Sequence, residues 1–241
     1  APVIQKMLIR NGMGSRYERL LRLEAKHFAE GIALSEEQIK LLEKANPVFA
    51  ERHVESSQPG ELICQDTKLI GNISGVGKIY LHAAVDAYGS YGWGFLHTSK
   101  QPEAAVALLH NYVIPQFDQW GMELQNILTD NGREFCGTEA HPYQLYLQLN
   151  EIKHRTTKVK SPQTNGFVER FNRTVKEEYL PISFRKKVYQ TLEQLQEDFD
   201  TWCQHYNYQR PHRGYRNMGK RPFDTVKAFI PKRKTTVSQD S

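Results

Sequence analysis

The sequence has few cysteines and no long apolar run. Its three cysteines, an odd number at scattered positions among 241 residues, support neither a disulfide framework nor a zinc site built from paired Cys-x-x-Cys motifs. No apolar stretch approaches the roughly 20 residues that a membrane-spanning helix needs, and no basic-then-apolar signal segment opens the chain. With 39% hydrophobic and 24% charged residues, we expect a soluble globular protein with its own core and no membrane partner.

The signatures of three common site types are also missing. The segment Gly71–Lys78 has five residues between its outer glycines and Ile79 after the lysine, whereas a Walker phosphate loop needs four residues and then Ser or Thr. That segment therefore predicts a hairpin turn. No Gly-x-Ser-x-Gly elbow is present for serine catalysis. The residues that come closest to a zinc-binding motif are Cys203, His205 and His212, and they do not have the spacing of zinc ligands.

Positive charge is concentrated in the second part of the chain. Residues 1–150 contain 13 basic and 17 acidic side chains, a net charge of −4, whereas residues 151–241 contain 19 basic and 10 acidic side chains, a net charge of +9. A basic half beside an acidic half suggests a face that binds a polyanion, most simply nucleic acid. A solvated basic surface without a partner is equally compatible with charge alone.

Composition divides the chain into four parts. Residues 1–50 have capping-box spacings and apolar stripes typical of short helices. Residues 51–60 are polar and end in Pro-Gly, which indicates a linker. We expect a folded core over residues 61–231 and a disordered tail over residues 232–241.

Within the core, strand and helix patterns alternate. Apolar runs bounded by turn residues predict strands at 62–66, 79–85, 91–97 and 124–128, and residues 152–156 are expected to be extended. Helical patterns cover 104–120, 143–149, a segment from 164 or 165 onward, and 189–206, and we expect Pro115 to end or kink the first of these. This order predicts an α/β fold in which helices cover a mixed sheet.

Three acidic residues lie where a carboxylate needs a partner. Asp66 ends a strand-like run, Asp130 ends another before the turn pair Asn131-Gly132, and Glu169 lies near the start of a helix. A carboxylate in or at the end of an apolar strand is costly unless something compensates its charge. Divalent cations with hard oxygen ligands, Mg²⁺ or Mn²⁺, suit a site made of several carboxylates.

The sequence motifs around these acids resemble those of a known family. Thr129-Asp-Asn-Gly-x-Glu-Phe135, Ser161-Pro-Gln-Thr-Asn-Gly-x-x-Glu-Arg-x-Asn172 and Tyr206-Asn-x-x-Arg-Pro-His-x-Gly214 resemble the catalytic core of retroviral-integrase-like DDE transposases of bacterial insertion sequences. The resemblance covers about Glu61 to Val226. It implies an RNase H-like fold, with a mixed five-stranded sheet and helices on both faces.

The resemblance also implies a catalytic triad that binds two Mg²⁺ (or Mn²⁺) ions. The first Asp falls on Asp66, the second on Asp130 and the Glu on Glu169, with Asp86 as the rival for the first acid. The family's gap between the last two acids is about 35 residues. Here it is 38, and we place the excess in the loop of residues 137–143.

Several polar residues are candidates for DNA contacts. Glu169, Arg173 and Lys176 are spaced to share one helix face, which can present two cations to phosphates near the metal-binding acid. An exposed Glu–Arg pair without function is the alternative. The remaining candidates precede or begin this helix: Lys158, Lys160 and Asn165. For Arg210 and His212 we favour packing or hydrogen bonds within the core.

The leading hypothesis is a Mg-dependent transposase that cleaves the DNA end of its element and joins the 3′-OH to target DNA. The resemblance implies DNA as partner, a homo-oligomer when assembled on DNA, and a location in the bacterial cytosol. Residues 1–50 resemble a truncated DNA-recognition module with linker helices, so we expect weak sequence-specific binding. The competing hypotheses are a catalytically silent DNA-binding or assembly protein and an RNase H-like nuclease.

Overall fold

The computed structural model describes Met7, Arg10, Asn11 and residues 56–73, 75–138, 140–157, 165–186, 188–212 and 217–231. The helices expected in residues 1–50 and the expected tail at 232–241 lie outside the described residues, apart from those three positions. None of the described helices is long and apolar enough to cross a membrane.

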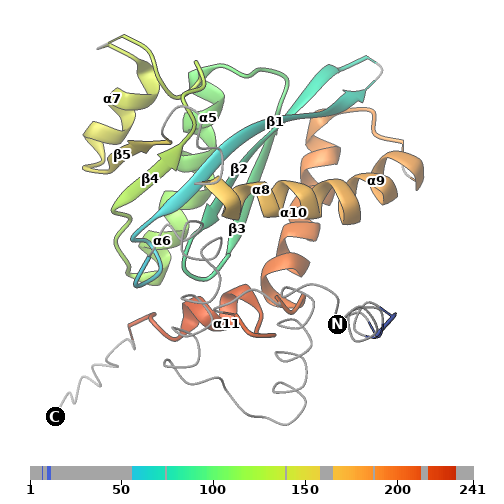
Figure 1. The fold of residues 1–241 in the computed structure, drawn as a ribbon. Coiled ribbons are helices and arrows are strands. Elements are labelled where there is room, and N and C mark those ends of the chain that lie inside the picture. The colour runs from blue at the N-terminus through green and yellow to red at the C-terminus, as the bar shows by residue number, and fades with distance from the viewer. Residues whose placement is uncertain are drawn as a thin grey trace, which may run out of the picture.

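Five strands form one mixed sheet in the order β3-β2-β1-β4-β5 (Figure 1). The central strand β1 (Ile63–Ile73) pairs antiparallel with β2 (Gly77–Asp86), and β2 pairs antiparallel with β3 (Gly92–His97). On the other side, β4 (Asn126–Thr129) lies parallel to β1, and β5 (Lys153–Thr156) lies parallel to β4. All five expected strands are therefore present.

The strand β1 is longer than the sequence predicts. Its pairing with β2 continues to the register Ile73↔Gly77, and a bulge leaves Ile70 unpaired between Leu69 and Gly71. Gly71, which we expected in the turn, pairs with Ile79 within the strand. The hairpin closes at Gly75 and Gly77, whose φ angles of 84° and 101° suit glycine. The hairpin interpretation of Gly71–Lys78 is confirmed.

Helices cover both faces of the sheet, because successive side chains of its strands point to opposite sides. Cys64 of β1 and Leu128 of β4 face a core with α8 (Gly166–Thr174) and α10 (Leu192–Tyr208). Ile63 and Ile127 face a second core. That core contains residues of α5 (Pro102–Leu108), α6 (Ile114–Trp120), α7 (Pro142–Leu149) and α11 (Pro222–Lys227).

Two of the helices contain π-helical turns. The helix expected over 104–120 runs from α5 through a π-helical turn at Leu109–Val113 into α6, so Pro115 does not end it. A proline cannot donate to the preceding turn, and a wider turn before it accommodates that loss. Likewise, α8 continues through a π-helical turn at Val175–Tyr179 into α9 (Leu180–Lys186).

The C-terminal motif stabilises the fold. The guanidinium of Arg210 makes a paired contact with the Glu178 carboxylate, and the His212 ring packs edge-on against Tyr206 at 4.4 Å between centroids. The Asn207 side chain accepts from Gly92 N–H and donates to Gly92 C=O, which extends the edge of β3. The prediction that Arg210 and His212 act within the core is confirmed for His212, which is buried, whereas Arg210 forms its ion pair with Glu178 at the surface and not in the core.

A buried histidine in β2 predicts acid sensitivity. Burial lowers the pKa of His82 to about 4, and its neutral ring accepts from Thr67 Oγ1 and donates to the Ser99 carbonyl. The unfolded chain takes up this proton near pH 6.5 and the folded chain only near pH 4, so stability falls as pH falls through this window. We expect His82 to account for a loss on the order of 2 kcal/mol. Urea unfolding at pH 7 and 4.5 should show a smaller loss in His82→Gln; an equal loss would contradict this assignment.

Candidate active site

Two of the three predicted acids lie side by side on the sheet. The parallel register aligns Cys64 of β1 with Leu128 of β4. Two residues further along each strand direction, Asp66 therefore lies beside Asp130. Asp66 follows Cys64 by two residues in the strand, so its side chain points to the same face of the sheet, which α8 covers. Its side chain is half-buried, whereas Asp130 is exposed at the end of β4.

The helix α8 is fastened to β1 at this position by two amides. Asn172 Nδ2 donates to Asp66 Oδ2 at 2.8 Å, and Asn165 Nδ2 donates to the Gln65 carbonyl at 3.1 Å. Glu169 precedes Asn172 by three residues, so it lies one turn away on a neighbouring part of the same helix surface and is exposed. The structure therefore brings the helix of Glu169 against the strand of Asp66.

The electrostatics around Asp66 are those of a carboxylate pair. Burial raises the pKa of Asp66, and the negative charge of Asp130 raises it further. The positive charges of Lys68 and Lys100 and the Thr67 N–H, which donates to Asp66 Oδ1 at 2.8 Å, act in the opposite direction. A cation bound beside Asp66 would offset both its burial and the repulsion from Asp130.

The oxygen atoms around Asp66 are suitable ligands for a hard divalent cation. Besides the two aspartates, the buried Asn172 Oδ1 has no hydrogen-bond partner, so an oxygen ligand is available beside the pair. Within the described part of the chain, however, no three His, Cys, Asp or Glu side chains lie close enough together to hold a metal ion. The fit thus rests on Asp66 and Asp130, and Glu169 does not close a three-acid group in this conformation.

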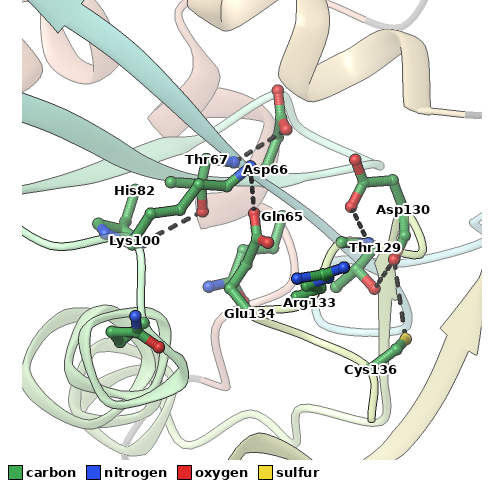
Figure 2. Close-up of polar contacts among 12 residues, drawn as sticks. Gln65, Asp66, Thr67, His82, Lys100, Thr129, Asp130, Arg133, Glu134 and Cys136 are labelled. Atoms are coloured by element: carbon green, nitrogen blue, oxygen red, sulfur yellow. Dashed lines mark hydrogen bonds and ion pairs between the residues drawn. The ribbon is translucent and has the colours of Figure 1, made fainter.

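Two loops next to the aspartates contribute an ion pair between a buried carboxylate and a half-exposed lysine. Figure 2 shows the Lys100 side chain reaching Glu134, with Nζ 3.0 Å from Oε1, close to Asp66. Glu134 follows Asp130 in the loop after β4, and Lys100 precedes α5. The sequence motif contained Glu134, but we assigned it no role, and Lys100 carried no signal.

Gly132 lies between two carboxylates of this loop. A Cβ at this position would lie 2.5 Å from Glu134 Oε2 and 2.8 Å from Asp130 Oδ1, and Gly132 N–H donates to Asp130 Oδ1 at 2.8 Å. Only glycine leaves both carboxylates in place.

We expect Gly132→Ala to lower any metal-dependent activity of this site about tenfold or more, because the methyl group displaces Asp130 or Glu134. Both contacts are to ends of side chains, so the melting temperature should change little. Activity and thermal unfolding are measured together, with Gly121→Ala as the control, because Gly121 is also in a turn but remote from the site. Since Gly121 has a φ of 66°, that control is expected to lose stability and not activity. Unchanged activity of Gly132→Ala would contradict the assignment of this loop to the site.

The rival first acid, Asp86, has a different environment. It lies at the end of β2 opposite Ile63 and is fully buried. Its carboxylate accepts from the backbone N–H groups of Gly60 and Gly89. These contacts favour a structural role for Asp86 and leave Asp66 as the acid beside Asp130.

The predicted DNA contacts divide into three groups. Lys158 and Lys160 lie outside the described residues. Arg173 and Lys176 are exposed along α8 and the π-helical turn after it, as the helical spacing predicts. Asn165 is only 6% exposed, and its Nδ2 is committed to the Gln65 carbonyl, which holds α8 against β1, while its buried Oδ1 has no hydrogen-bond partner.

Asn172 is the functional candidate that sequence reasoning missed. It stood in the quoted motif without an assigned role, although its position three residues after Glu169 places it on the same side of the helix as the predicted acid. That spacing was the signal that could have identified it.

The mixed five-stranded sheet with helices on both faces is the RNase H-like fold of retroviral integrase catalytic cores. The HTLV-2 integrase catalytic core domain, solved in complex with magnesium, superposes with a TM-score of 0.51 at 19% identity and covers 71% of this chain and 99% of that one. An intasome of simian T-cell lymphotropic virus, in complex with a PP2A regulatory subunit, has a TM-score of 0.58 at 16% identity and covers 88% and 74%.

Sequence comparison agrees with the fold. Two models described as integrase core domain match residues 56–162 and 150–219, and the chain belongs to the integrase core domain family. Transposase InsD of the Escherichia coli insertion element IS2 is 34% identical over 92 residues, which cover 37% of this chain and 28% of that protein. The chain spans 28–39% of the length of the first curated relatives that it matches.

Proposed function

We propose that this protein is a DNA transposase of the DDE type, which cleaves the DNA end of its element and joins the freed 3′-OH to target DNA. The observation that carries the proposal is the placement of Asp66 beside Asp130 at neighbouring parallel strands, with Glu169 on the helix that Asn172 fastens to Asp66. Family membership and the likeness to IS2 transposases support the same reaction class.

Asp66, Asp130 and Glu169 are the proposed ligands of two Mg²⁺ (or Mn²⁺) ions. When bound, the ions supply Lewis-acid stabilisation of the oxygens around the reacting phosphorus. The carboxylates of Asp66 and Asp130 bind from adjacent strands, and Glu169 adds its carboxylate from α8. Asn172 orients the Asp66 carboxylate through its 2.8 Å hydrogen bond.

The two reactions are chemically alike, so one site can perform both. In the first, a water oxygen attacks the phosphodiester at the element end and the 3′ oxygen leaves. In the second, that 3′-OH attacks a target phosphodiester and displaces another 3′ oxygen. Both are in-line displacements at phosphorus. The proposal includes a homo-oligomer assembled on DNA in the bacterial cytosol, in keeping with the intasome among the structural relatives.

A strand-transfer assay tests the proposal. The protein is incubated with a labelled duplex that already carries a free 3′-OH, with supercoiled plasmid as target, and with or without Mg²⁺. Covalent joining that requires Mg²⁺ and Asp130 supports the proposal. Hydrolysis of an RNA–DNA hybrid without joining would favour an RNase H-like nuclease, and DNA binding with neither reaction would favour a silent assembly protein.

The exposed cations of α8 predict a measurable salt effect. We expect Lys176→Ala to reduce the slope of log affinity against log salt by about 1 and to weaken binding equally on unrelated duplexes, because a phosphate contact carries no sequence information. Salt titrations on two duplexes measure this. Lys227→Ala is the matched control, since Lys227 is exposed on α11, which packs on the opposite face of the sheet. An unaltered slope for Lys176→Ala would remove Lys176 from the DNA face, and a loss on one duplex alone would indicate base reading.

A further inference from the structure

The ion pair between Lys100 and Glu134 joins the two loops that flank Asp66 and Asp130. The Glu134 side chain is 3% exposed, and that of Lys100 is 45% exposed, with 3.0 Å between Nζ and Oε1. A carboxylate buried to this degree needs a compensating cation. Neutralising Glu134 is therefore one role of Lys100, and the geometry points to a second.

The ammonium group of Lys100 is held in place by its contact with the Glu134 carboxylate. A lysine side chain on a surface is usually mobile, whereas here a buried carboxylate fixes the end of the chain. The contact with Glu134 Oε1 is made by one of the three ammonium protons. The half-exposed group can therefore donate to a ligand that arrives from solvent.

The fixed ammonium lies at the proposed reaction centre. Figure 2 shows the end of the Lys100 side chain at Glu134, beside β1 at the position of Asp66, with Asp130 nearby. The burial of Lys100 opposes its charge, but Glu134 first and then Asp130 and Asp66 raise its pKa above the usual value for lysine. The positive charge of Lys100 in turn acts to lower the pKa of Asp66.

We propose that Lys100 is a phosphate-binding residue of this site, positioned by Glu134 to donate to a non-bridging oxygen of the DNA phosphate brought to Asp66 and Asp130. Lysine binds phosphate as a point charge, and phosphoryl transfer adds negative charge around the phosphorus that a fixed cation stabilises. No bond of Lys100 forms or breaks. The inference rests on the proposed function, because it places the scissile phosphate at these two aspartates.

A charge-neutral double variant separates this proposal from a purely structural ion pair. Lys100→Met alone leaves Glu134 buried without its cation, so it can fail to fold for reasons unrelated to DNA. In Lys100→Met with Glu134→Gln both charges are removed together, and the fold should be kept. Lys78→Met is the matched control, because Lys78 is exposed at the far end of the β1–β2 hairpin.

The three proteins are compared with wild type on a fluorescent duplex of arbitrary sequence with a free 3′-OH. Affinity is measured over a range of salt in Ca²⁺, strand transfer is measured in Mg²⁺, and the melting temperature is measured without DNA. For the double variant we expect a near wild-type melting temperature, a salt slope reduced by about 1, and strand transfer slowed about 10²-fold. Lys78→Met should match wild type in all three.

Wild-type affinity, salt slope and strand transfer in a well-folded double variant would overturn the proposal and leave the ion pair a structural one. If the double variant does not fold, Glu134→Gln alone, which keeps the lysine but frees its tip, is measured in its place. We expect slower strand transfer from that variant, and an unchanged rate would overturn the proposal. Failure of the proposed function looks different, because wild type itself would then not join DNA, and the salt slopes alone would decide whether Lys100 contacts phosphate.

Discussion

Asp66→Asn, Asp130→Asn and Glu169→Gln are each expected to lower Mg²⁺-dependent cleavage and joining by about 10³-fold or more while the protein stays folded. Removing one ligand charge removes the electrostatic stabilisation of the transition state that the bound ions supply. Burial and the neighbouring Asp130 raise the pKa of Asp66, so a neutral amide relieves a repulsion. Asp66 accepts from the Thr67 N–H and from Asn172 Nδ2, but the Asn172 amide can turn its unpartnered Oδ1 toward a new NH₂ group, so no donor need be left unsatisfied. The melting temperature should therefore be unchanged or raised.

Strand transfer and thermal unfolding are measured on the same preparations. Asp118→Asn, on the remote helix α6, is the control for removing an exposed acid and should be fully active. Retained activity in Asp66→Asn together with an inactive, folded Asp86→Asn would show that the first acid is wrongly assigned. Loss of folding in all three triad variants would contradict the account of Asp66 and Asp130 as a cation site.

Asp86→Asn is expected to behave in the opposite way and to destabilise the protein by about 3 kcal/mol. The fully buried Asp86 carboxylate accepts from Gly60 N–H at 3.0 Å and from Gly89 N–H. An amide has one accepting oxygen, so its NH₂ group would face an N–H donor, which leaves a buried donor unsatisfied. For a chain of this size the melting temperature should fall by roughly 6–12 °C.

Urea unfolding of Asp86→Asn beside Asp66→Asn measures this difference. The residual folded fraction of Asp86→Asn should still join DNA in proportion to its amount, because Asp86 is not a ligand in this account. A stable but inactive Asp86→Asn would exchange the roles of the two acids.

Local patterns in the sequence were sufficient for most of the fold. Four of the five strands follow from apolar runs between turn residues, whereas the edge strand β5 is polar (Lys153–Thr156) and was expected only as an extended segment. The faces of the sheet follow from alternation, as Ile63 and Cys64 illustrate. The prediction that Pro115 ends or kinks the helix was wrong in part, because the helix continues through the π-helical turn at Leu109–Val113. A proline indicates that a hydrogen bond of the helix is lost, but its position in the sequence does not decide between a break, a kink and a wider turn that lets the helix continue.

The site was predictable only where a motif held the residues together. Asp66 and Asp130 followed from the family resemblance, and the parallel register of β1 and β4 places them side by side. Only Asp130 follows a strand end, because β1 continues past Asp66 to Ile73, contrary to the prediction that Asp66 ends its strand. The contact of Lys100 with Glu134 joins residues from separate loops, and no spacing predicts it. The burial of Asn165 likewise depends on the docking of α8 onto β1, so the sequence could not separate an internal amide from one that contacts DNA.

The central claim is that divalent ions bind between Asp66 and Asp130 and recruit Glu169. A crystal of the protein bound to a DNA end, grown with Mn²⁺, tests this directly through anomalous scattering at the manganese edge. The account predicts two peaks about 3.5–4 Å apart, in contact with the carboxylates of Asp66, Asp130 and Glu169. Peaks at Asp86 or elsewhere, or a DNA-bound site whose carboxylates hold no manganese, would contradict it.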